Sequence, residues 1–304
     1  MRAVARLRTD RQTAGNLLVL ASTVAFAIGP TAARLAYDDG SNALTVVTLR
    51  GMIGAALMAL LIQASGQGFG LDRRASRWCL CCGAFSALVV YGFIGSVAYV
   101  PVSVAVLVFF THPILIATTA HWRGGDRLSA KKLFLAFGAF AGLALVLGPE
   151  FGALDRAGLA LAALAAIAMC GMILCSVRAQ ERATSAQVNF YATAVSSAGF
   201  ALLTTTLGAW ALPSGMVGWL GIACAGVGVG IGLLAFFAAL RHLSPVRATM
   251  LSNVEPLVSI LFAAAILGER LEPPQWAGVA LVIAALVLFE AVGRGEDRSG
   301  VARR

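Results

Sequence analysis

Three ionisable side chains lie inside long apolar stretches of the sequence, where charged groups are unusual. His112 and Glu255 each stand about nine or ten residues from one end of such a stretch, and Arg50 stands about six residues into another. At about 1.5 Å of rise per helical residue, His112 and Glu255 fall near the middle of a helix long enough to cross a bilayer. A charge at that depth costs on the order of 2.5–3.5 kcal/mol. These side chains are therefore expected to face the protein interior.

A proline directly follows two of these residues, Pro113 after His112 and Pro256 after Glu255. Proline lacks the backbone N–H, so it breaks the helical hydrogen-bond ladder and frees carbonyl groups at that depth. A carboxylate beside free carbonyls can bind a cationic amine or a proton. The alternative is that Glu255 and His112 cap broken helices or pair with neighbouring side chains.

Arg50 also has two interpretations. It can bind the carboxylate of a substrate, or neutralise Glu255 if the fold brings the two together; alternatively, its long side chain extends to the outer membrane interface. Single polar residues such as Ser252 and Asn253 more often join helices than bind ligands. The predicted substrate or proton pathway comprises Glu255, His112, Arg50, Asn253, Ser252 and Tyr99, with helix breaks at Pro113 and Pro256. Other residues that can line it are Tyr91, Asn189, Tyr191 and Thr249.

The composition favours a lipid-facing surface: 59% of the 304 residues are hydrophobic, only 12% are charged, and the mean hydropathy is +0.85. The net charge of +9 does not indicate a nucleic-acid partner, because the basic residues form short clusters between apolar stretches. The six cysteines form no CxxC pair, which argues against a metal or redox site. The sequence contains no Walker, HExxH or GxSxG motif, so neither an enzyme nor a cofactor is expected.

Ten apolar stretches are long enough to span the roughly 30 Å hydrocarbon core of a bilayer. Because lipid cannot satisfy backbone hydrogen bonds, these stretches are predicted to be helices. The first is too long for the apolar region of a signal peptide, so it is expected to be a retained helix. The predicted spans are 15–37, 44–65, 78–98, 102–122, 132–149, 157–178, 187–208, 216–240, 246–267 and 274–293.

The basic residues alternate between the two sides of these spans. Nineteen Lys and Arg residues lie in the two tails and in the loops after the even-numbered spans, and three (Arg34, Arg156 and Arg270) lie in the other loops. The positive-inside rule then predicts a multi-pass protein of the cell inner (plasma) membrane with both termini in the cytoplasm.

The sequence matches itself at an offset of 143 residues. Gly125-Asp126-Arg127-Leu128 reappears as Gly268-Glu269-Arg270-Leu271, and His112-Pro113 falls on Glu255-Pro256. Since each copy has an odd number of spans, the second enters the membrane from the opposite side. The expected fold is all-α, with ten transmembrane helices in two inverted five-helix repeats, residues 1–150 and 151–304. Such repeats are a recurrent basis of alternating access.

These features resemble the drug/metabolite transporter superfamily, in particular its EamA-type members. The resemblance rests on ten short spans, duplicated five-helix units and a proline in the fourth helix of each unit, Pro113 and Pro256. The segment Asn253-Val254-Glu255-Pro256-Leu257, followed by Gly268-Glu269-Arg270-Leu271 and an apolar helix containing Gly278, is similar to the typical ending of the family. At His112 the chain departs from many relatives. The resemblance implies export of amino acids or related metabolites.

The sequence therefore predicts a secondary transporter of small metabolites that works by alternating access, and the alternative is a passive channel or facilitator. The expected partners are a small-molecule substrate and the lipid bilayer, with proton coupling through Glu255 or His112 as the simplest drive. Gly138 and Gly142 form a GxxxG pattern that fits helix packing or a homodimer. The glycine run 226–232 has no preceding strand, so we interpret it as close helix packing rather than a dinucleotide loop.

Overall fold

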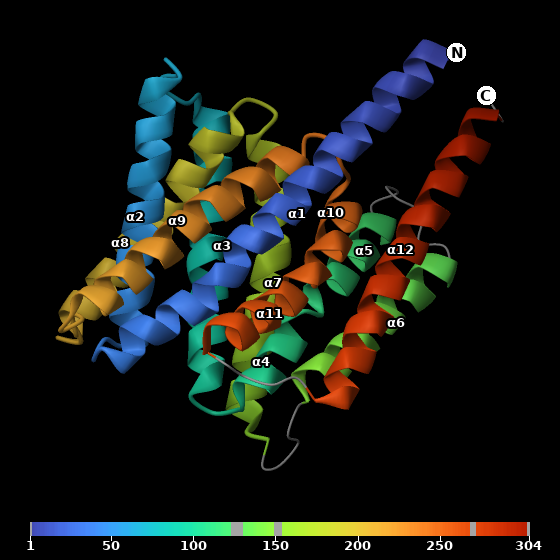
Figure 1. Ribbon diagram of the computed structural model, residues 1–304. Helices are drawn as coiled ribbons and strands as arrows, with labels where there is room; N and C mark the ends of the chain where they lie inside the picture. Colours follow the sequence, from blue (N-terminus) through green and yellow to red (C-terminus); the bar gives the residue numbers. More distant parts are fainter. Residues whose placement is uncertain (1, 123–129, 149–153, 268–271, 303–304) are drawn as a thin grey trace.

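The structure is a computed structural model and describes residues 2–122, 130–148, 154–267 and 272–302, which are helical with no strand (Figure 1). The two copies of the repeated Gly-Asp/Glu-Arg-Leu motif lie outside these residues. The helices are α1 (Arg2–Asp38), α2 (Ala43–Ala64), α3 (Arg73–Val97), α4 (Val102–Phe109), α5 (His112–Trp122), α6 (Ala130–Leu147), α7 (Arg156–Ala179), α8 (Ser185–Thr206), α9 (Met216–Ala239), α10 (Pro245–Leu251), the short 3-10 helix η1 (Ser252–Val254), α11 (Glu255–Leu267) and α12 (Pro273–Ala302).

Each predicted span overlaps one helix, except that the spans at 102–122 and 246–267 are each broken in the middle. Within the described residues, seven helical segments are long and apolar enough to cross a membrane. They are 11–38, 43–64, 73–97, 102–122, 156–179, 216–239 and 273–292. The helices outside this set differ in kind, since α8 carries many polar residues and α10–α11 is interrupted by η1. The chain therefore has the helices of a multi-pass membrane protein.

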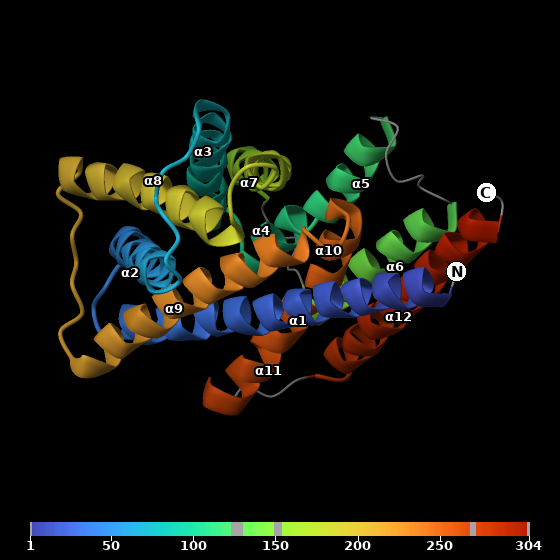
Figure 2. The ribbon, with the colours of Figure 1, turned by 90° about the horizontal axis from the view of Figure 1, so that it is seen from above.

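The main packing partners of each helix come from the other half of the chain. Helix α1 lies along α9, α3 along α7, α2 along α8 and α9, and α6 along α12 (Figures 1 and 2). The first turns of α1 and the last turns of α12 project from the same end of the bundle (Figure 1). The two halves therefore interdigitate, and each completes the packing of the other.

The bundle has an apolar outside and a partly polar inside, which is the arrangement that lipid favours. Large apolar side chains point outward along the helices, among them Leu17, Leu60, Phe134, Ile167 and Leu202. Hydroxyl and amide side chains are buried and bond the backbone or a neighbouring helix. Thr48 of α2, for example, meets Thr204 of α8 at 3.2 Å, and Asn189 of α8 donates to the Gly230 carbonyl of α9 at 2.8 Å.

The glycine run of α9 fits that helix between α1 and α2. A Cβ atom on Gly226 or Gly230 would meet α2, and one on Gly228 or Gly232 would meet α1. On Gly228 it would lie 2.6 Å from the Ala25 carbonyl oxygen, closer than any side chain can approach. The run therefore carries two interleaved glycine ridges, which confirms close helix packing as its role.

The GxxxG pattern of α6 likewise packs within the chain. A Cβ atom on Gly142 would lie 2.9 Å from the Val282 amide nitrogen and 3.0 Å from the Gly278 carbonyl oxygen, both on α12. A Cβ atom on Gly138 would instead meet only the Ala285 methyl group, at 3.8 Å. Gly142 is thus used in the contact between α6 and α12 and does not indicate a dimer.

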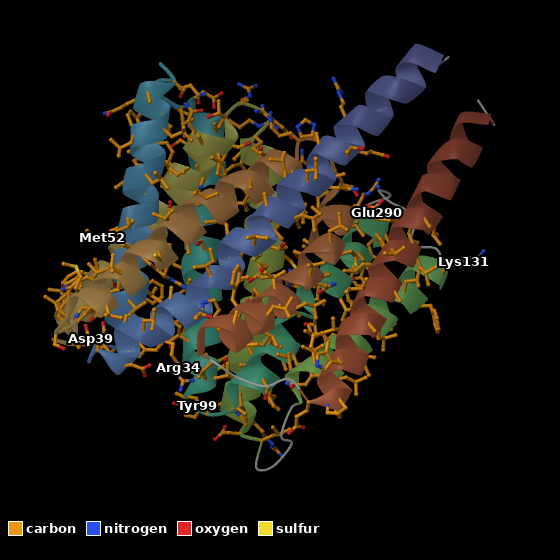
Figure 3. All side chains as sticks on the ribbon, viewed as in Figure 1. Arg34, Asp39, Met52, Tyr99, Lys131 and Glu290 are labelled. Carbon is orange, nitrogen blue, oxygen red and sulfur yellow. The ribbon has the colours of Figure 1, made fainter. Side chains whose placement is uncertain are left out.

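Polar contacts close the two ends of the bundle. At one end, Asp39 in the turn between α1 and α2 accepts hydrogen bonds from the Gly215 and Gly218 amides, at 2.7 and 3.2 Å (Figure 3). Gly215 precedes the first turn of α9 and has no side chain to cap it, so Asp39 supplies the cap from another loop. In the loop between α2 and α3, Asp72 pairs with Arg182 at 2.6 Å.

Asp39→Asn is expected to lower the thermal unfolding midpoint by roughly 2–4 °C at pH 7. The Gly215 amide and the Ser214 hydroxyl lower the pKa of Asp39. A folded pKa below the unfolded one gives stability that is present above the unfolded pKa, about 3.9 for Asp, and is lost as pH falls through the folded pKa. The difference between variant and wild type should therefore shrink below about pH 4. Asp38→Asn, which removes only the exposed pair with Arg34, is the control; equal midpoint losses for the two variants would contradict the capping role.

Candidate functional site

Two broken helices form the candidate site. Helix α4 ends at Phe109 and α5 begins at His112, whereas α10 ends at Leu251 and η1 leads into α11 at Glu255. In both places a proline is the second residue of the new helix, where its missing N–H is tolerated. The predicted breaks at Pro113 and Pro256 are therefore present.

The two breaks lie in one apolar layer. Phe109 and Phe110 from the first break, and Val254 and Leu257 from the second, belong to the same hydrophobic cluster, which side chains of α6 and α12 complete. Further along, α5 packs on α10, whereas α4 packs on α7 and α11 packs on α1. Polar groups at the breaks are thus held between apolar walls.

His112 is the most buried of the predicted site residues, with 2% of its surface exposed. Its Nδ1 atom lies 3.0 Å from the Phe109 carbonyl oxygen. The rings of Phe109 and Phe110 lie beside the imidazole, with centroids 5.0 and 5.6 Å from it. The thiol of Cys170 on α7 approaches the His112 carbonyl oxygen at 3.6 Å. In the part of the chain that the structure describes, the buried Nε2 atom has no hydrogen-bond partner.

Glu255 begins α11 and is partly buried. Among the described residues, no Lys, Arg or His lies within ion-pair distance of its carboxylate. Ser252 and Asn253 are buried just before it, and the Ser252 hydroxyl donates to the Thr249 carbonyl at 2.7 Å. The carboxylate therefore stands beside the second helix break without a counter-ion from the described chain.

Arg50 lies in α2, partly buried, and its backbone carbonyl faces Gly226 of α9. Over the described residues it forms no ion pair with Glu255, so the interpretation in which these two neutralise each other gains no support. Both charges therefore keep the role of candidate ligands for groups outside the protein.

Tyr99 is separate from the buried group. It lies in the turn between α3 and α4 and is 53% exposed. Figure 3 places it with Arg34 and Asp39 at the end of the bundle opposite Glu290. The structure thus brings Ser252, Asn253 and Glu255 together at one break and His112 at the other, and leaves Tyr99 outside.

Sequence reasoning missed an ion pair between Arg247 of α10 and Glu290 of α12. Both side chains are only 14% exposed, and the Arg247 Nε atom donates to a Glu290 carboxylate oxygen at 2.9 Å. A second guanidinium nitrogen contacts the other oxygen, so the contact is bidentate. The sequence analysis assigned Arg247 to a loop, whereas it lies within a helix and ties α10 to α12. The signal that pointed to it was a glutamate inside the last apolar stretch.

The comparisons with known proteins agree with this architecture. Residues 13–148 and 156–290 each match the model of the EamA-like transporter family. A protein of Sinorhizobium sp., described as an uncharacterized transporter in the cobO 3' region, is 32% identical over 91 residues, which are 29% of this chain and 64% of that protein. A solved crystal structure is similar over 92% of this chain and 98% of that one, with a TM-score of 0.80 and 19% identity. At that identity it shows the fold alone.

Proposed function

The chain belongs to the EamA-like transporter family, and from this premise we propose that it is a secondary transporter of small metabolites that works by alternating access. The observation that carries the proposal is the pair of helix breaks, with an unpaired Glu255 at one and a buried His112 at the equivalent position of the other. Following the family resemblance, the proposed substrates are amino acids or related compounds, and the direction is export. A passive facilitator on the same fold is the alternative.

We further propose ten transmembrane helices in two inverted repeats, one in each half of the chain. The family model matches twice, and the starts of its two matches, residues 13 and 156, differ by the same 143 residues as the internal repeat. The helix contacts support this too. Exchanging each helix for its repeat partner turns the α1–α9 contact into the α7–α3 contact, and leaves α2–α8 and α6–α12 unchanged.

The end contacts support the same symmetry. Asp39 precedes Arg182 by 143 residues, and Asp72 precedes Gly215 by 143 residues. The contact of Asp39 with Gly215 at one end therefore uses the same pair of repeat positions as the contact of Arg182 with Asp72. Inverted repeats would put these equivalent contacts on opposite faces of the membrane.

One asymmetry between the halves favours a carrier over a passive channel. The repeat exchanges α4 with α10 and α5 with α11, so a fully symmetric bundle would pack α5 on α10 and α4 on α11 equally. In the structure α5 packs on α10, whereas α4 and α11 pack mainly on α7 and α1 (Figure 2). With the termini placed in the cytoplasm by the positive-inside rule, this is a conformation closed at the cytoplasmic side of the inner membrane.

Within this proposal, Glu255 binds a proton or a cationic amine of the substrate, and Arg50 binds an anionic group. Both are ionisable groups within membrane-spanning helices, which are functional candidates by default. Ser252 and Asn253 are placed to support the break beside Glu255. Any ion coupling would most simply use the proton.

Counterflow in vesicles tests the proposed function. Purified protein is reconstituted into liposomes that are loaded with a mixture of unlabelled amino acids, and uptake of labelled amino acids from outside is followed. A carrier should show saturable uptake that preloading accelerates, because each substrate molecule leaving returns the empty site. Uptake that neither saturates nor responds to preloading would favour the facilitator. No uptake of any amino acid above protein-free liposomes would remove the proposed substrate class.

A further inference from the structure

The Phe109 carbonyl has lost its usual helical partner. In a continuous helix it would accept a hydrogen bond from the N–H four residues on, but that residue is Pro113, which has none. The imidazole of His112 occupies this place, with Nδ1 3.0 Å from the carbonyl oxygen. A carbonyl oxygen only accepts hydrogen bonds, so the geometry requires a hydrogen on Nδ1.

This contact determines what the other ring nitrogen offers. With the hydrogen on Nδ1, a neutral imidazole carries a bare lone pair on Nε2. The charged form would bury a cation between the Phe109 and Phe110 rings, and the described residues place no carboxylate within ion-pair distance of it. Nε2 is therefore a hydrogen-bond acceptor, fully buried and without a partner in the described chain.

We propose that Nε2 of His112 is the acceptor subsite of the transport pathway, which receives an N–H or O–H group of the substrate, and that the Phe109 carbonyl is a positioning group that fixes the required tautomer. This inference rests on the proposed function and narrows it to substrates that carry a hydrogen-bond donor. A buried acceptor without a partner is costly. A substrate that supplies the donor is thus favoured over an isostere that lacks it.

Three variants separate the two nitrogens of the ring. His112→Asn keeps a donor close to the Nδ1 position and removes the Nε2 acceptor. His112→Gln puts its amide near the Nε2 position and loses the contact with Phe109. Pro113→Ala restores a backbone N–H for the Phe109 carbonyl and releases Nδ1. Pro256→Ala is the matched control, because the Ser252 carbonyl there already accepts from the Glu255 amide and no imidazole is involved.

The first measurement is independent of transport. ¹⁵N NMR of histidine-labelled protein in bilayers distinguishes protonated from unprotonated ring nitrogens, and the chain has only three histidines. We expect His112 to show protonated Nδ1 and unprotonated Nε2 in the wild type and in Pro256→Ala. In Pro113→Ala we expect a mixture of both tautomers. A protonated Nε2 in the wild type would overturn the inference.

The second measurement uses matched competitors in the counterflow assay. Threonine and valine have nearly the same shape and differ by one hydroxyl group, and glutamine and its N,N-dimethyl amide differ by two N–H donors. In the wild type, the donor-bearing member of at least one pair should compete at least about tenfold better. His112→Asn should abolish that ratio, and His112→Gln should keep part of it.

The possible failures are distinguishable. Unchanged competitor ratios in His112→Asn, with normal counterflow, would overturn the acceptor subsite and leave the proposed transporter intact. The histidine would then only brace the helix break. Wild-type vesicles without counterflow would remove the proposed function, and the subsite with it.

Discussion

Glutamine at position 255 is expected to abolish the response of transport to a pH gradient. The carboxylate of Glu255 stands at a helix break without a basic partner among the described residues. Glutamine keeps its size and hydrogen bonding but cannot gain or lose a proton. If Glu255 carries the proton, Glu255→Gln should still exchange substrate across the membrane. Accumulation driven by a pH gradient should then fall at least about tenfold, the range of effect typical for a positioned proton-transfer group.

A different result is expected if Glu255 binds the substrate amine directly. Exchange itself should then fall, because an amide attracts a cation much less than a carboxylate does. Glu272→Gln, at an exposed glutamate just before α12, is the matched control and should leave both activities unchanged. Normal exchange and a normal pH response in Glu255→Gln, at equal membrane expression, would restrict this residue to a structural role.

Alanine at position 142 is expected to destabilise the protein by about 1–3 kcal/mol, the usual cost of overpacking. The added methyl group would lie 2.9 Å from the Val282 amide nitrogen and 3.0 Å from the Gly278 carbonyl oxygen. Both are backbone atoms, so the clash is relieved only if α6 and α12 move apart. Gly138→Ala, one turn away, meets only a methyl group at 3.8 Å. It should be neutral or stabilising by up to about 1 kcal/mol, since alanine favours helix more than glycine does.

Unfolding of the purified protein in mild detergent measures both changes. Gly278→Ala should resemble Gly142→Ala, because its methyl group would lie 2.6 Å from the Gly142 carbonyl oxygen. The double variant should lose less than the sum of the two single losses, since both act on one contact. Equal unfolding midpoints for Gly142→Ala and Gly138→Ala would show that α6 and α12 are not in close contact.

Helix positions were predictable because lipid imposes a simple rule on apolar stretches: the backbone must bond to itself. The stretch predicted at 216–240 is α9, Met216–Ala239. The breaks at Pro113 and Pro256 followed from the missing N–H of proline. The outer bounds of α1 and α12 did not follow from apolarity, since both helices continue into charged sequence. Arginine and glutamate favour helix in water as well.

The contacts that hold the site could not be predicted from sequence alone. Arg247 and Glu290 lie 43 positions apart, and Asp39 and Gly215 lie 176 apart. No local periodicity links such positions, because each pair depends on which helices become neighbours. Tyr99 was assigned to the interior, yet it falls between the predicted spans 78–98 and 102–122. That position already favours a turn, and the structure has one.

The pairing of α1 with α9 has a consequence for biosynthesis. Some 180 residues separate the two helices. At about 5–20 residues per second, α1 is in the membrane for on the order of ten to forty seconds before the ribosome has made α9. Two of its hydroxyl side chains are suited to this wait, since Ser22 donates to the Val19 carbonyl at 2.7 Å and Thr23 donates to the Leu20 carbonyl at 2.8 Å, within the same helix. The first half of the nascent chain is therefore an inserted but unassembled set of helices, which assembles only when the second half arrives.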